Sequence, residues 1–147
     1  ALPIYVHIRL DERLAKEVPL KAGLLELLKY LKANNYKTIV ATSSARVRVD
    51  VILKNALIEQ YFDDTICGDE VIHGKPNPEI FLTACKKLNV APSEALVLED
   101  SESGILAAYD GKIDALCIPD MKYPEADFAS KATKIISSLK DVIEYLK

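Results

Sequence analysis

The sequence lacks the patterns that mark disulfide-bonded, zinc-binding, nucleic-acid-binding and membrane proteins. Its cysteines are odd in number, none forms a CxxC pair, and all lie in apolar stretches: Cys67, Cys85 and Cys117. We therefore expect reduced, buried thiols and a cytoplasmic protein. The two histidines, His7 and His73, are too few and too far apart for a zinc site. Basic residues are scattered and the formal charge is −3, so we expect no nucleic-acid partner. No apolar run approaches the ~20 residues of a membrane span.

The start of the chain, Ala1-Leu2-Pro3-Ile4, has neither an initiator methionine nor the basic segment of a signal peptide. We therefore expect a chain that has been processed, nicked or cut from a longer protein. The 147 residues, half of them hydrophobic and 28% charged, suit one globular domain with a sizeable core.

Short apolar runs alternate with longer amphipathic stretches, which is typical of a parallel sheet with crossover helices. Strands are predicted at 37–41, 65–67, 95–98, 115–118 and, as a short edge strand, 132–136. Helices are predicted at 22–34, 45–55, 78–88, from 103 to 109, and at 138–146. The N-terminal segment fits two patterns. Alternation of Ile4, Val6 and Ile8 suggests a strand, whereas the apolar spacing that continues through Leu14 favours a helix ending before Val18-Pro19. We predict the helix.

Glu99 and Asp100 follow a buried strand directly. Two adjacent carboxylates repel each other, and a divalent cation such as Mg²⁺ would relieve that repulsion. The alternative is a solvated loop in which Asp100 or Ser101 caps the next helix. The carboxyl edge of an open α/β sheet is where such folds bind ligands.

Two further segments could handle an anion. Lys75 stands in Gly74-Lys75-Pro76, where a stiff turn could hold its charge against a phosphate or an acid, although a plain surface lysine is the alternative. Thr42-Ser43-Ser44 ends a strand and precedes a helix whose first turn contains Arg46, so hydroxyls, backbone N–H groups and a guanidinium could bind phosphate. Simple N-capping by Ser43 or Ser44 is the alternative there.

Taken together, these segments resemble the haloacid dehalogenase superfamily, in its phosphatase and β-phosphoglucomutase-like branch. The resemblance rests on PLKAGLLELLKYLKANNYKTIVATSS, on GKPNPEIF followed by LEDSESGILAA, and on ALCIPD. It implies an α/β, Rossmann-like parallel-sheet core. It also implies roles: Thr42 holds the transferring phosphoryl group, Ser43, Ser44 and Arg46 line the neighbouring phosphate loop, and Lys75 balances charge. Asp100 is implied as the direct Mg²⁺ ligand and Glu99 as the adjacent acid.

The family's nucleophile is an aspartate in a DxDxT or DxDxV motif on its first strand, and the sequence contains no such motif. We therefore expect an incomplete core over 19–147, preceded at 1–18 by a remnant of the helical cap or a linker to the core. The missing strand would be central, between those ending at Thr42 and Asp100. Its loss would expose unpaired backbone, so we expect a complementing N-terminal fragment or strand-swapped self-association, with Ile4 to Ile8 filling the gap as a less favoured alternative.

The resemblance implies a Mg²⁺-dependent phosphatase acting on a small phosphorylated metabolite such as a sugar phosphate, with no membrane partner. A β-phosphoglucomutase-like phosphomutase is the enzymatic alternative, and a non-catalytic truncated fragment is the other. A receiver-like regulatory domain also places acids and a lysine at strand ends, but the GKPxP and LEDSxxGI spacing argues against it.

Overall fold

The computed structural model describes residues 4–6, 24–55, 58–99, 101–118, 131–136 and 139–147. Within these residues a single sheet has the order β3-β2-β1-β4-β5-β6, and each strand runs parallel to its neighbours. The strands are β1 (Ile4–Val6), β2 (Thr38–Ala41), β3 (Asp64–Ile66), β4 (Leu96–Glu99), β5 (Asp114–Cys117) and β6 (Lys134–Ile135). The helices are α1 (Leu24–Ala33), α2 (Arg46–Asn55), α3 (Glu79–Leu88), α4 (Glu102–Asp110) and α6 (Leu139–Leu146). The predicted α/β, Rossmann-like parallel-sheet core is confirmed.

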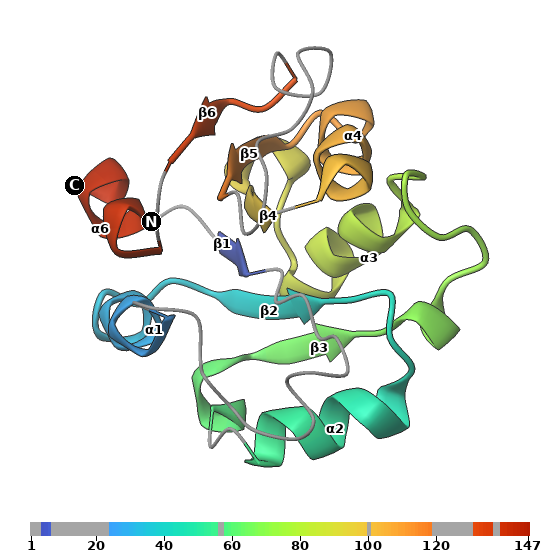
Figure 1. The fold of residues 1–147 in the computed structure, drawn as a ribbon, viewed down its shortest axis with the longest axis horizontal. Coiled ribbons are helices and arrows are strands. Elements are labelled where there is room, and N and C mark those ends of the chain that lie inside the picture. Colours follow the sequence, from blue (N-terminus) through green and yellow to red (C-terminus); the bar gives the residue numbers. More distant parts are fainter. Residues whose placement is uncertain (1–3, 7–23, 56–57, 100, 119–130, 137–138) are drawn as a thin grey trace.

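Helices cover both faces of the sheet, because alternate strand residues point to opposite sides. Val40 and Leu98 pack with α1, α2 and α6, whereas Ile39 and Val97 pack with α3 and α4. Figure 1 shows α1 and α6 to the left of the sheet and α3 and α4 to its right. Burial on both faces explains why the central strands are apolar throughout rather than alternating.

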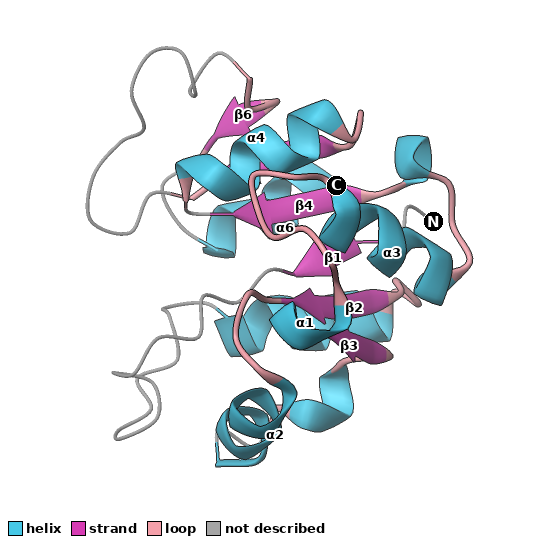
Figure 2. Ribbon diagram, turned by 90° about the vertical axis from the view of Figure 1, so that its right-hand side faces the viewer, coloured by secondary structure: helices cyan, strands magenta, loops and turns pink. Residues whose placement is uncertain are grey.

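The central position of the sheet, predicted to lack a strand, is occupied by β1. Ile4, Tyr5 and Val6 pair with Thr38–Val40 of β2 on one side and with Leu96–Leu98 of β4 on the other. Figure 2 shows β1 lying between these two neighbours. The helix predicted from Ile4 is therefore wrong for these three residues, and the less favoured alternative is the one observed.

The physical reason is the demand for hydrogen-bond partners. Two buried strands with unpaired inner edges would leave costly orphan N–H and C=O groups, and a short apolar segment in the middle satisfies both edges at once. The rest of the predicted cap remnant, residues 7–18, lies outside the described residues, so that assignment and the boundary at 18–19 stay predictions.

The helix and strand ends match local sequence signals. α1 ends where Asn35 takes a left-handed backbone with φ 61°, as the predicted stop at Asn34-Asn35 requires. Asn89 ends α3 in the same way, with φ 57°. Ser101 caps α4 by accepting a hydrogen bond from the Gly104 N–H. Within the described residues, no helix is both long and apolar enough to cross a bilayer.

Candidate functional site

The carboxyl ends of β2 and β4 flank the central strand; Thr42, Ser43, Ser44 and Arg46 follow β2, Glu99 ends β4, and Lys75 lies between β3 and α3. Because all these strands are parallel, their carboxyl ends open at the same edge of the sheet, the usual ligand-binding edge of open α/β folds. The described central strand, Ile4-Tyr5-Val6, carries no carboxylate. The candidate phosphate-binding residues thus lie at the carboxyl edge of the sheet, and the described residues of β1 include no aspartate that could act as a nucleophile.

Thr42 is buried at the end of β2, with 2% of its surface exposed. Its backbone N–H donates to Ile66 O at 3.0 Å, which ties the end of β2 to β3. Its side-chain oxygen Oγ1 accepts from the Ser44 N–H at 3.2 Å. This threonine hydroxyl is thus built into the turn at the sheet edge, as a hydroxyl that bonds the backbone two residues on.

Ser43 and Ser44 form a tight contact with the loop after β3. The Gly68 N–H donates to Ser44 O at 2.8 Å, and a Cβ at position 68 would lie 2.1 Å from Ser43 O. Only glycine fits this close approach. At the start of α2, the Arg46 N–H lies 3.3 Å from each of the two Asp69 carboxylate oxygens.

The Arg46 side chain lies against β3 and against the short 3-10 helix that follows it, Gly68–Glu70. Its guanidinium pairs with Glu70, bonds Thr65 Oγ1, and donates to Thr65 O at 3.0 Å. Burial lowers the pKa of Arg46, but the hydrogen bond that its guanidinium donates to Glu70 and nearby negative charges outweigh this effect and leave the pKa raised. The structure thus places Arg46 in an ion-pair network, and its role as a phosphate ligand stays a prediction.

Lys75 forms a buried ion pair with Glu99. Lys75 Nζ lies 3.2 Å from Glu99 Oε2, and the exposed fractions of the two side chains are 6% and 0%. The ammonium also lies 5.2 Å from the centre of the Phe81 ring, within cation–π range. Pro76 follows Lys75 through a cis peptide bond. The alternative of a plain surface lysine is excluded by this burial.

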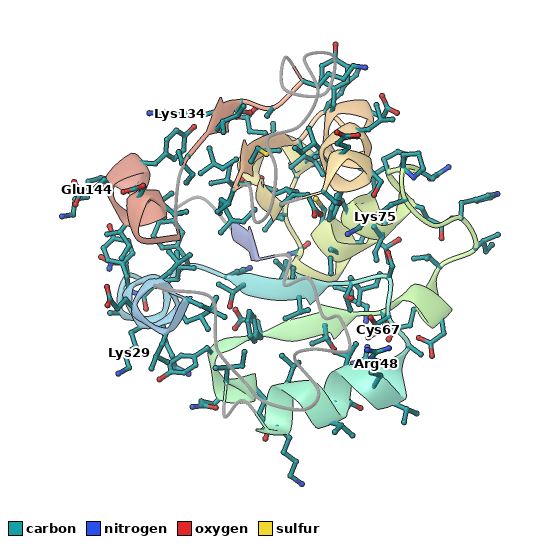
Figure 3. The ribbon with its side chains drawn as sticks, in the orientation of Figure 1. Lys29, Arg48, Cys67, Lys75, Lys134 and Glu144 are labelled. Carbon is teal, nitrogen blue, oxygen red and sulfur yellow. The ribbon has the colours of Figure 1, made fainter. Side chains whose placement is uncertain are left out.

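The ion pair brings together two predicted site residues that are 24 positions apart in the sequence. In Figure 3, Lys75 lies beside α3 and α4, well apart from Cys67 near the start of α2. Phe81 was not expected to contribute to the site. The only sequence signal for it is its place six residues after Lys75 in GKPNPEIF. Asp100 lies outside the described residues, so its predicted role as a metal ligand is not tested.

A second group of possible ligands lies at the other end of this edge. Atoms of Cys67, Asp69 and Glu70 lie within 4.8 Å of one another. Burial raises the pKa of the Cys67 thiol to about 11, which keeps it protonated at neutral pH. Arg46 already supplies a positive charge to Glu70. The assignment of Mg²⁺ to Glu99 and Asp100 stays a prediction.

The sequence of this chain is similar to those of known hydrolases. A model of haloacid dehalogenase-like hydrolases matches residues 2–110. The chain is 38% identical over 108 residues to a phosphorylated carbohydrates phosphatase of Thermotoga maritima, covering 74% of this chain and 49% of that protein. It is 36% identical over 120 residues to a validoxylamine A 7'-phosphate phosphatase of Streptomyces hygroscopicus, covering 82% and 55%.

The fold of this chain is also similar to that of solved structures. A β-phosphoglucomutase from Clostridium difficile superposes with a TM-score of 0.74 at 27% identity, covering 86% of this chain and 54% of that one. The chain thus spans about half the length of the curated relatives it matches.

Proposed function

Because the chain belongs to the haloacid dehalogenase-like hydrolase family, we propose that it forms the phosphate-handling core of a Mg²⁺-dependent phosphatase for a small phosphorylated metabolite, such as a sugar phosphate. The observation that carries the proposal is the buried Lys75–Glu99 ion pair at the carboxyl edge of β4. A buried ion pair by itself adds little stability, and this one holds a positive charge at the sheet edge where open α/β folds bind ligands. The named activity of relatives on phosphorylated carbohydrates supports the substrate class.

In this proposal several residues bind the phosphoryl group, each with its own role. The Thr42 hydroxyl, which accepts the Ser44 N–H, donates its own proton to one phosphoryl oxygen, the Ser43 N–H donates to another, and the Lys75 ammonium balances their charge. Arg46 would add a donor only after leaving Glu70 and Thr65, so its contribution is the weakest of the set.

The metal would be held by Asp100 and Glu99. The donor chemistry fits, because Glu99 places a buried carboxylate at the end of β4 and a second carboxylate follows it in sequence. A bound Mg²⁺ would supply positive charge to stabilise an in-line phosphoryl transfer. Glu99 also neutralises Lys75 when phosphate is absent, which keeps that ammonium buried and in place.

Family members transfer the phosphoryl group to an aspartate of the DxDxT or DxDxV type, which this sequence lacks. The chain by itself is accordingly expected to bind phosphate and Mg²⁺ without turnover. Catalysis would need a polypeptide that carries the aspartate, either a complementing N-terminal fragment or another chain.

The test uses the purified protein and measures its mass, its binding of phosphate and its hydrolysis of a phosphate ester. Intact-mass analysis establishes whether a second polypeptide is present. Calorimetry then measures the binding of inorganic phosphate with and without Mg²⁺, and p-nitrophenyl phosphate measures hydrolysis. We expect a single species of about 16.3 kDa that binds phosphate, with binding weakened at least tenfold in Lys75→Ala and Asp100→Asn. Arg46→Ala is the matched control and should change binding least.

The outcomes separate the alternatives. Binding without hydrolysis supports a non-catalytic phosphate-binding fragment of such an enzyme, whereas Mg²⁺-dependent hydrolysis supports a complete enzyme. Failure to bind phosphate under any condition refutes the proposal. Likeness to a β-phosphoglucomutase keeps a phosphomutase as the second candidate. If turnover is found, ³¹P NMR of a sugar phosphate distinguishes an isomerised sugar phosphate from released inorganic phosphate.

A further inference from the structure

The Glu99 carboxylate is held from two sides, and one side is the first turn of α4. Its Oε1 accepts two hydrogen bonds from Ser101, one from the backbone N–H at 3.0 Å and one from the hydroxyl at 2.9 Å. Its Oε2 faces Lys75 Nζ at 3.2 Å. Because the two oxygens are engaged in different directions, the carboxylate plane has little freedom to rotate.

The Ser101 hydroxyl has a second task at the same time. It accepts the Gly104 N–H at 3.1 Å, which makes Ser101 the N-cap of α4. A hydroxyl has one proton and two lone pairs, so it can donate to Glu99 while it accepts from Gly104. The orientation of Glu99 is therefore linked to the start of the helix through a single oxygen atom.

Gly104 provides the space for this arrangement. A Cβ at this position would lie 1.9 Å from Glu99 Oε2 and 2.0 Å from Glu99 Cδ. The carboxylate thus packs directly against the helix backbone, and glycine is the residue type that leaves room for it. The Glu99 side chain is 0% exposed, so it cannot turn toward solvent without breaking its ion pair with Lys75.

We propose that Ser101 and Gly104 are positioning residues, which orient the Glu99 carboxylate so that its Oε2 holds the Lys75 ammonium at the sheet edge. Neither residue needs to touch substrate; they act through Glu99. The importance of Lys75 for phosphate rests on the proposed function, whereas the positioning itself is a property of the free protein and is tested there.

The test measures how well Lys75 is protected from acetylation by an N-hydroxysuccinimide ester, with peptide mass spectrometry as the readout. Lys29 and Lys134 are exposed and lie far from Lys75 in Figure 3, so they serve as internal references. Glycine is nearly as good an N-cap as serine, whereas alanine is poor. Ser101→Gly therefore removes the hydroxyl while largely preserving the helix cap, and Ser101→Ala removes both.

We expect Ser101→Gly and Ser101→Ala to raise the relative acetylation rate of Lys75 about tenfold, the scale of a lost hydrogen bond to a charged group. Ser101→Thr, which keeps the hydroxyl, should restore protection. Ser103→Ala is the matched control, because it deletes an exposed hydroxyl on the same turn that lies 3.4 Å from the Ser101 hydroxyl oxygen. Circular dichroism establishes that each variant is folded under the labelling conditions.

The proposal is overturned if Lys75 stays protected in the folded Ser101→Gly variant, which would leave Ser101 as a helix cap only. Because no phosphate is present in this experiment, its failure is distinct from failure of the proposed function. Phosphate calorimetry on Ser101→Gly then links the two. If the proposed function holds, phosphate affinity should fall with the loss of Lys75 protection and recover in Ser101→Thr.

Discussion

Gly104→Ala is a substitution for which helix propensity and tertiary contact predict opposite results. Gly104 lies in the first turn of α4, where replacing glycine by alanine ordinarily gains up to about 1 kcal/mol. In this structure the added methyl group would overlap the Glu99 carboxylate, at 1.9 Å from Oε2. The overlap is with a side chain that is 0% exposed, so the carboxylate must leave its place beside Lys75.

The expected cost follows from the pair that is broken. Separating one partner from a buried ion pair costs about 3–5 kcal/mol, because the other charge stays buried without compensation. After the helix gain is subtracted, Gly104→Ala should lower the free energy of unfolding by about 2–4 kcal/mol. That is a large part of the stability of an ordinary domain.

Urea unfolding followed by far-ultraviolet circular dichroism measures this change. Gly74→Ala is the matched control, because no atom lies within 4 Å of a Cβ built at position 74, and its effect should stay within about 0.5 kcal/mol. The double variant Gly104→Ala/Glu99→Ala should be no less stable than Glu99→Ala alone, since the overlap is then gone. A Gly104→Ala protein as stable as the wild type, or additive effects in the double variant, would refute the reasoning.

Three further predictions concern other parts of the fold. Exposed Lys112 has a left-handed backbone with φ 60°, which is strained for a residue with a Cβ atom. Lys112→Gly should therefore raise the free energy of unfolding by about 0.5–1 kcal/mol, and a decrease would show that the residue is not strained. Burial raises the pKa of Glu70, but hydrogen bonds from Arg46 and Lys87 outweigh it and leave that pKa below the usual 4.5. A carboxyl group whose pKa is lower in the folded state than in the unfolded state stabilises the fold at pH values above its unfolded-state pKa. This stabilisation is lost as the pH falls through the folded-state pKa. The stability difference between wild type and Glu70→Gln should thus shrink below about pH 4.5, and a constant difference in urea titrations would be the contrary result. The three cysteines are buried and none is in a disulfide, so their thiols should resist Ellman's reagent at pH 8 and all react in urea, whereas rapid native labelling would show them to be accessible.

Local patterns in the sequence were enough to predict most elements and the edge at which the site lies. KTIVA and ALVL are apolar because their strands are buried on both faces, and the stops at Asn35 and Asn89 have a backbone reason in their left-handed conformation. Glu99 could be placed at a strand end because it directly follows such a run. These features depend on residues within a few positions of one another, which is the range over which periodicity carries information.

Three features were decided only by tertiary structure. The sequence pattern favoured a helix at Ile4–Val6, and pairing with two distant strands determines the observed strand. Lys75 reads as a surface lysine in a proline-rich loop until Glu99 and Phe81 enclose it. Gly104 reads as an ordinary weak point in a helix until the Glu99 carboxylate packs against it. In each case the arrangement depends on interactions of buried polar groups from segments that are far apart in the sequence. No local sequence pattern contains that information.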